Sequence, residues 1–140
     1  MSKKADGKRR IVIVGDDRDF LAMARMWLKP RYEVATLDDG EELRKLIKSL
    51  KPDLLILNAW RPGQDGFELC CRLALEMECQ SMPVLFVTER QEESFYRRNV
   101  SIGGISFLSK PTRRQELTTR VAEILKNAGG PQERQGEGSG

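Results

Sequence analysis

The stretch DLLILNAWRPGQDG, residues 53–66, decides the fold class of this chain. Its apolar residues 54–57 end at the amide Asn58, and a short apolar run bounded by turn-forming residues is typical of a buried strand. A proline and two glycines then predict a turn, and a helix is expected within residues 66–79. Open α/β sheets place reactive groups at such a strand end. The stretch therefore predicts a functional position that holds an amide instead of a carboxylate.

The segments on both sides repeat this alternation of a short strand with an amphipathic helix. In residues 18–30 apolar side chains recur at helical spacing, Asp19 is the predicted N-cap, and Pro30 marks the end. The predicted strands cover residues 11–15, 32–37, 53–57, 83–88 and 106–109. Helices are predicted within residues 18–30, 43–50, 66–79 and 92–100, and from about Thr112 onward. Because each parallel crossover needs a helix, this order predicts a doubly wound α/β fold.

The composition is that of one folded domain with polar ends. The chain has 140 residues, of which 39% are hydrophobic, so a single compact core is expected. The formal net charge of +3 comes mainly from lysines and arginines near the N-terminus. We predict a disordered basic tail over residues 1–9, one domain over residues 10–127, and a flexible Gly-rich tail or linker over residues 128–140.

Several functional classes are not supported by the sequence. No apolar run reaches the length of a membrane span and no secretory signal is present, so we expect a cytoplasmic location without membrane contact. The chain has three cysteines, Cys70, Cys71 and Cys79, and no histidine. An odd number of cysteines without histidine indicates neither a disulfide framework nor a zinc site. No recognition-helix pattern occurs, so nucleic acid is not an expected partner.

Residues suited to phosphoryl transfer stand where four of the predicted strands end. They are Asp16 and Asp17, Asn58, Thr88, and Lys110. Carboxylates can hold Mg²⁺, a carboxylate nucleophile can accept the phosphoryl group, and threonine and lysine can bind its oxygens. Each residue alone has a structural explanation, such as a helix cap or a solvated lysine. Their joint placement indicates a phosphoryl-transfer site that lacks its nucleophile.

Six stretches give the chain a resemblance to a known family. They are IVIVGDD, KPDLLILN, RPGQDGFEL, MPVLFVTER, GGISFLSKP and RRQEL, in this order between residues 10 and 126. The chain resembles the receiver domain of the bacterial two-component response regulators. This resemblance implies a flavodoxin-like sheet of five parallel strands in the order 2-1-3-4-5, with helices on both faces. It also implies a place in two-component signal transduction or in a phosphorelay.

The resemblance assigns a role to each residue at the strand ends. Asn58 falls on the phospho-accepting aspartate. Gly15 falls on the first of two adjacent acidic positions, and Asp16 on the second. Thr88 and Lys110 match the switch hydroxyl and the site lysine. The site is therefore a degenerate phosphorylation site, because both its nucleophile and one of its acids are replaced.

Three further positions belong to this comparison. Phe107 lies where the family has its rotating aromatic residue, and Pro111 follows a bond that is commonly cis in the family. Glu89 occupies a position that is usually small, so it adds bulk and negative charge to the path of the phosphodonor. An engineered change of aspartate to Asn58 would not account for Gly15 and Glu89.

The chemistry of the substituted site predicts no acyl phosphate and weak metal binding. An amide is a poor nucleophile. Mg²⁺ prefers carboxylate oxygens, and only Asp16 and Asp17 remain as acidic candidates beside the Asn58 amide oxygen and a carbonyl near Trp60. We also expect Lys110 to turn toward Asp16 or Asp17, since a partly buried ammonium needs a counter-charge. No cofactor and no catalytic residue are expected.

The sequence favours a pseudo-receiver, a non-enzymatic signalling module that binds a protein partner without phosphorylation. Two alternatives stay open: a phosphorylatable receiver with an unusual acceptor such as Asp17, and the N-terminal regulatory domain of a longer DNA-binding response regulator. The resemblance places signal or dimer contacts on the face of helix 4, strand 5 and helix 5. Its candidate residues here are Phe95, Tyr96, Arg97, Arg98, Arg113, Arg114 and Arg120. The partner would be an acidic signalling protein or a second copy of the chain.

Overall fold

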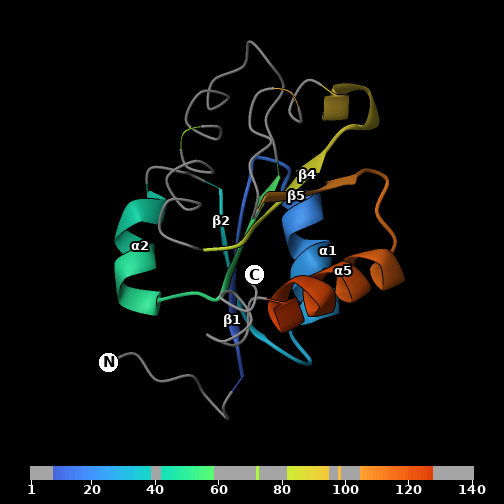
Figure 1. Ribbon diagram of the computed structural model, residues 1–140. Helices are drawn as coiled ribbons and strands as arrows, with labels where there is room; N and C mark the ends of the chain where they lie inside the picture. Colours follow the sequence, from blue (N-terminus) through green and yellow to red (C-terminus); the bar gives the residue numbers. More distant parts are fainter. Residues whose placement is uncertain are drawn as a thin grey trace, which may run out of the picture.

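One parallel sheet organises the molecule (Figure 1). The structure is a computed structural model that describes residues 8–38, 42–58, 72, 82–94, 98 and 105–127. In these residues five parallel strands lie in the order β2-β1-β3-β4-β5, which confirms the predicted topology. The strands are β1 (Arg10–Val14), β2 (Glu33–Leu37), β3 (Leu54–Asn58), β4 (Val84–Thr88) and β5 (Ile105–Ser109).

The burial of each strand follows its place in the sheet. The central strands β3 and β4 are buried along their whole length, as expected for apolar strands covered on both faces. The edge strands β2 and β5 are mostly half-buried. The continuous apolar runs that predicted the strands therefore mark the centre of the sheet.

Helices cover both faces of the sheet, which confirms the doubly wound fold (Figure 1). The described helices are α1 (Arg18–Leu28), α2 (Leu43–Leu50), α5 (Arg114–Asn127) and a short 3₁₀ helix, η3 (Arg90–Glu92). Side chains of α1 and α5 pack with Ile13 and Ile56 in one core cluster. Leu43 of α2 packs with Val12 and Leu55 in the other cluster. None of the described helices is long and apolar enough to span a membrane.

The N-cap of α1 differs from the prediction. Asp17 is the cap instead of Asp19, and its carboxylate accepts a hydrogen bond from the Phe20 amide at 3.1 Å. The backbone explains the difference, because a cap residue lies outside the helical region of φ and ψ. Asp17 has φ −93° and ψ 94°, whereas Asp19 already belongs to the first helical turn.

Ordered contacts begin slightly before the predicted start of the domain. Lys8 and Arg9 are described, and Arg9 Nη1 donates to the Leu125 carbonyl at 2.7 Å. Arg10 Nη1 donates to the Leu50 carbonyl at the end of α2. Four predicted segments lie wholly or mostly outside the described residues. They are residues 1–7 of the tail predicted over 1–9, the helix within 66–79 except Arg72, most of the helix within 92–100, and the C-terminal tail.

Candidate functional site

The strand register brings the predicted site residues to one edge of the sheet. Val14 pairs with Leu57, and Asn58 pairs with Val87 on the next strand. Thr88 pairs with Ser109, the residue directly before Lys110. The residues that follow β1 and β5 therefore lie beside the ends of β3 and β4, as the sequence predicts.

Gly15 and Asn58 are in direct contact at the ends of β1 and β3. Asn58 is only 1% exposed. A Cβ atom on Gly15 would lie 2.4 Å from the Asn58 Cβ and 2.9 Å from its Nδ2. These separations are shorter than van der Waals contact, so any larger residue at position 15 requires the two strand ends to shift. Gly15 is thus matched sterically to the side chain at position 58, a relation that the sequence alone does not reveal.

Two buried polar atoms at the strand ends make no hydrogen bond in the described part of the chain. They are Asn58 Oδ1 and Thr88 Oγ1, and both residues are 1% exposed. Leaving such a group unpaired costs about 1–3 kcal/mol. Within the described residues, these two oxygens without protein partners lie side by side at the strand ends where Lys110 also lies.

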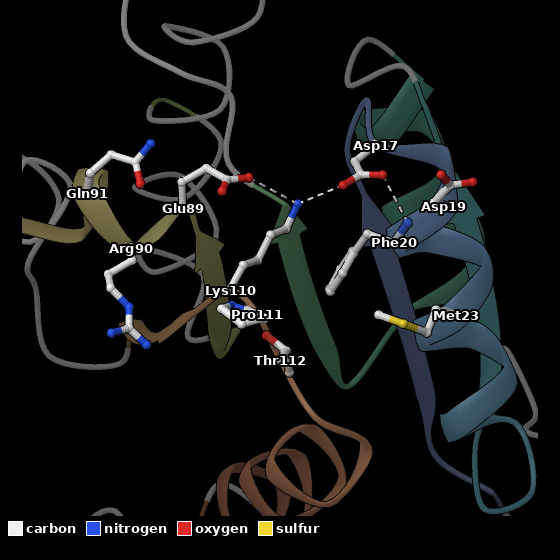
Figure 2. A pocket seen from close by; sticks show the side chains of 10 residues that line it. All are labelled: Asp17, Asp19, Phe20, Met23, Glu89, Arg90, Gln91, Lys110, Pro111 and Thr112. Atoms are coloured by element: carbon white, nitrogen blue, oxygen red, sulfur yellow. Dashed lines mark hydrogen bonds and ion pairs between the residues drawn. The ribbon is translucent and has the colours of Figure 1, made fainter.

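Lys110 bridges two carboxylates, one from α1 and one from the segment after β4 (Figure 2). Its Nζ lies 2.8 Å from Asp17 Oδ2 and 3.7 Å from Glu89 Oε2. The same atom lies 5.0 Å from the centre of the Phe20 ring, within cation–π range. The predicted pairing of Lys110 is therefore confirmed for Asp17, whereas Asp16 is exposed to solvent. The lysine charge is compensated by carboxylates of the protein itself.

Asp17 holds this arrangement together through two hydrogen bonds. It accepts from the Phe20 amide as the cap of α1 and from Lys110 Nζ across the site. The hydrogen bond from Lys110 is the main reason that the pKa of Asp17 lies below its ordinary value, and burial opposes this effect only in part. Asp17 is therefore ionised at neutral pH.

Phe107 points into the core. It is 5% exposed and stacks on Phe86, with ring centres 5.7 Å apart and an angle of 7° between the ring planes. The bond between Lys110 and Pro111 is cis, as the resemblance implies. Ser109, the last residue of β5, donates from its hydroxyl to the Glu93 carboxylate beyond η3.

The comparison with known families agrees with this arrangement. The model of the response regulator receiver domain matches residues 11–122, which is most of the chain. The chain belongs to this family.

Two curated relatives illustrate where such receiver domains occur. PhoB of Rhizobium meliloti, a phosphate regulon transcriptional regulatory protein, is 34% identical over 120 residues, which are 85% of this chain and 53% of PhoB. RcaC of Microchaete diplosiphon is 31% identical over 118 residues, which are 84% of this chain and 18% of RcaC. This receiver domain thus spans about half of the first relative and less than a fifth of the second.

A solved structure shows the same fold. The crystal structure of a response regulator described as putative, from Chloroflexus aurantiacus, is similar with a TM-score of 0.70 and 32% identity. The match covers 85% of this chain and 98% of that one. The receiver fold therefore extends over nearly all of the matched structure.

The described donors of this receiver domain do not fit the acidic oxygen shell that Mg²⁺ prefers. In the residues that the structure describes, no cluster of three or more His, Cys, Asp or Glu side chains could hold a metal ion. Gly15 supplies no ligand, and the carboxylate of Asp17 already accepts from Lys110 and Phe20. The predicted carbonyl near Trp60 lies outside the described residues.

The predicted interaction face is only partly described. Phe95, Tyr96 and Arg97 lie outside the described residues, whereas Arg98, Arg113 and Arg114 are exposed. Arg120 differs from these arginines, because its Nη1 donates to the Phe107 carbonyl at 2.7 Å. Arg120 thus fastens α5 to β5 and is half-buried, and its place on the interaction face stays a prediction.

Two contributions to the site were missed by sequence reasoning. Glu89 was read only as an obstacle to a phosphodonor, but its carboxylate is also close to Lys110. Phe20 was assigned only to the core face of α1, but its ring lies against the lysine ammonium. A signal for Glu89 existed, since residues directly after neighbouring strands β4 and β5 are adjacent in a parallel sheet.

Proposed function

We propose that this receiver domain is a pseudo-receiver, which is not phosphorylated at Asn58 and acts as a non-enzymatic protein-interaction module in bacterial signal transduction. The observation that carries the proposal is the contact between Gly15 and Asn58. An amide occupies the acceptor position, and the neighbouring acid that would help to hold a metal ion could be accommodated only after a shift of the two strand ends.

The pairing of Lys110 supports the same proposal. A lysine ammonium binds a phosphoryl oxygen best when its N–H groups are not already directed at other acceptors. Here Lys110 already lies between Asp17 and Glu89. A phosphoryl group would have to compete with both carboxylates and would be repelled by them. Lys110 thus has two carboxylates as counter-charges without phosphate, and we expect weak Mg²⁺ binding at most.

A phosphorylation assay tests this proposal. Wild type is incubated with acetyl phosphate and Mg²⁺, and its intact mass is compared with that of a receiver domain that has the acceptor aspartate. We expect no added phosphate on the wild type. An acid-labile phosphate that disappears in Asp17→Asn would instead establish the alternative of an unusual acceptor and overturn the proposal.

A second function is favoured by the lengths of the relatives. Since the match covers about half of PhoB, a transcriptional regulatory protein, this domain is also a candidate regulatory domain of a longer DNA-binding regulator. The two functions are compatible, because a pseudo-receiver can regulate an attached domain through its partner contacts. If phosphorylation of this domain controlled DNA binding by an attached domain, the second function would hold without the first.

We place the partner contacts on the exposed arginines Arg98, Arg113 and Arg114 of the face predicted from helix 4, strand 5 and helix 5, where an acidic protein or a second copy could bind. Charge reversal at Arg98, Arg113 and Arg114 should abolish self-association or partner capture. The matched control is Lys45→Glu on α2, which is also exposed but lies on the opposite face of the sheet. Equal loss of association in both variants would show that the α5 face has no specific role.

A further inference from the structure

A cavity of about 630 Å³ lies beside the bridge made by Lys110 (Figure 2). Binding sites for small molecules typically have volumes of about 300–1,000 Å³. The cavity lies between α1 and the segments that follow β4 and β5. Its lining includes neither Gly15 nor Asn58 nor Thr88. The cavity is therefore distinct from the position of the phospho-acceptor.

The two walls of the cavity are largely apolar. Phe20 and Met23 come from α1, and Figure 2 shows both side chains directed toward Lys110 and Pro111. The opposite wall is made by Pro111, Thr112 and the aliphatic stem of Lys110. Phe20 is 3% exposed, so its ring is held firmly by the core. An apolar body between these walls would be shielded from water, which is favourable.

The charges around the cavity favour a cation on the side of α1. Asp17, Asp19 and Glu89 all line it, and only Lys110 lies between two of these carboxylates. Asp19 is exposed and has no hydrogen-bond or ionic partner in the described residues. Arg90, the other cation of the lining, lies on the opposite side of the view in Figure 2. Carboxylates therefore exceed cations near Phe20.

The carboxylates of Asp17 and Glu89 can each accept a hydrogen bond from a further donor. The Asp17 side chain is 42% exposed and the Glu89 side chain 39% exposed. A carboxylate has about four lone-pair positions, and Asp17 uses two of them for Phe20 and Lys110. A ligand ammonium can thus approach Asp17 without displacing Lys110, and Asp19 adds a second negative charge to the same lining.

We propose that this cavity binds a small amphipathic cation. The apolar body lies between the α1 wall and Pro111, and a primary ammonium lies at the carboxylates of Asp17 and Asp19. Asn58 does not line the cavity, so the proposed binding does not require a phosphoryl group at position 58.

Three probes with one body and different head groups test the proposal. They are 3-phenylpropylamine, 3-phenylpropanol and 3-phenylpropionate, titrated into the domain while amide and methyl NMR shifts are recorded. The amine should bind with a dissociation constant of about 1–10 mM, as expected for so small a ligand. It should bind about 2- to 5-fold more tightly than the alcohol, and the carboxylate most weakly. The shifts should centre on Phe20, Met23 and Thr112.

Matched variants separate the cavity from general surface binding. Met23→Ser should weaken all three probes, whereas Met26→Ser, three residues later on the same helix and 58% exposed, should not. Asp19→Asn should remove most of the preference for the amine and leave the alcohol unchanged, with Glu42→Gln on α2 as its control. Any of four results would overturn the proposal. They are tightest binding of 3-phenylpropionate, equal binding of the amine and the alcohol, unchanged binding in Met23→Ser, and no saturation with any probe.

Discussion

At the scale of single residues, Asn58 and Gly15 have to be considered as a pair. The close approach of a Cβ at position 15 to the Asn58 Cβ means that neither residue can be changed without effect on the other. A larger residue at position 15 requires the ends of β1 and β3 to shift, because its Cβ would meet a side-chain atom that rotation about side-chain bonds cannot move away. The glycine at position 15 is therefore also a feature of the packing between β1 and β3.

Gly15→Ala should lower the free energy of unfolding by about 1–3 kcal/mol, because the added methyl overpacks a buried contact. Asn58→Gly removes the Cβ that it would meet. The loss of unfolding free energy in the double variant should then be smaller than the sum of the two single losses, by an interaction energy of about 0.5–3 kcal/mol. Urea unfolding of all four proteins measures this cycle, and strict additivity would show that the two side chains do not compete for space.

Asp17 predicts a dependence of stability on acid. Its pKa in the folded protein lies below the ordinary value of 3.8, mainly through Lys110. The contribution of Asp17 is therefore fully present above the unfolded pKa and is lost as the pH falls through the folded pKa. The stability difference between wild type and Asp17→Asn should shrink between pH 5 and pH 2, about the range in which such a carboxylate titrates.

Thermal unfolding at several pH values measures this difference. Asp19→Asn is the control, because its carboxylate accepts neither the Phe20 nor the Lys110 hydrogen bond. A constant difference between wild type and Asp17→Asn over this range would contradict the assigned role of Asp17.

At the scale of the elements, α2 ends in an unusual way. Its C-cap, Lys51, has φ 50° and ψ 64°, a left-handed conformation that favours glycine. Pro52 follows and prevents the helix from continuing. The sequence indicated this end through the proline, but not the left-handed lysine.

Lys51→Gly should stabilise the protein by about 0.5–1 kcal/mol, because glycine adopts this conformation without a Cβ penalty. The matched control is Lys29→Gly at the C-cap of α1, where φ is −62° and the backbone is helical. There glycine should destabilise by about 1 kcal/mol. Chemical denaturation compares the two, and a loss of stability in Lys51→Gly would contradict the argument.

The elements themselves were predictable because their patterns are local. Runs such as residues 11–14 and 84–87 are apolar throughout, and the place of their strands inside the sheet explains why. The helical repeat in α5 likewise predicted a buried stripe of Leu117, Val121, Ile124 and Leu125, of which Ile124 is only half-buried. The cap at Asp17 was missed because Asp19 is an equally good cap by residue type. Backbone dihedrals, which a residue pattern does not contain, decide between them.

At the scale of the whole molecule, the sheet order made the site predictable in outline. Because β1, β3, β4 and β5 follow one another in the sheet, the residues after their carboxyl ends lie close together. The side-chain details were not predictable from the sequence. The steric fit of Gly15 to Asn58 and the cavity beside Phe20 depend on contacts between residues far apart in the chain.

A metal titration follows from this view of the site. With few free carboxylates at the strand ends, Mg²⁺ at millimolar concentration should change the melting temperature by less than about 1 °C, because only binding to the folded state stabilises. The fluorescence of Trp60 should also change little. A receiver domain with a complete acidic site is the control. A saturable increase in melting temperature would show that Asp16 and Asp17 form a working metal site.

The central claim is that the whole site, and not Asn58 alone, has lost phosphoryl transfer. The most direct measurement is the intact mass of Asn58→Asp after incubation with acetyl phosphate and Mg²⁺, beside the triple variant Gly15→Asp/Asn58→Asp/Glu89→Ala. The single variant should gain no appreciable phosphate, because metal binding and access of the donor stay impaired. The triple variant should gain phosphate to the extent that the ends of β1 and β3 shift to admit the new acid. Modification of the single variant as readily as of the triple variant would contradict the account, because Asn58 would then be the only change that prevents phosphorylation.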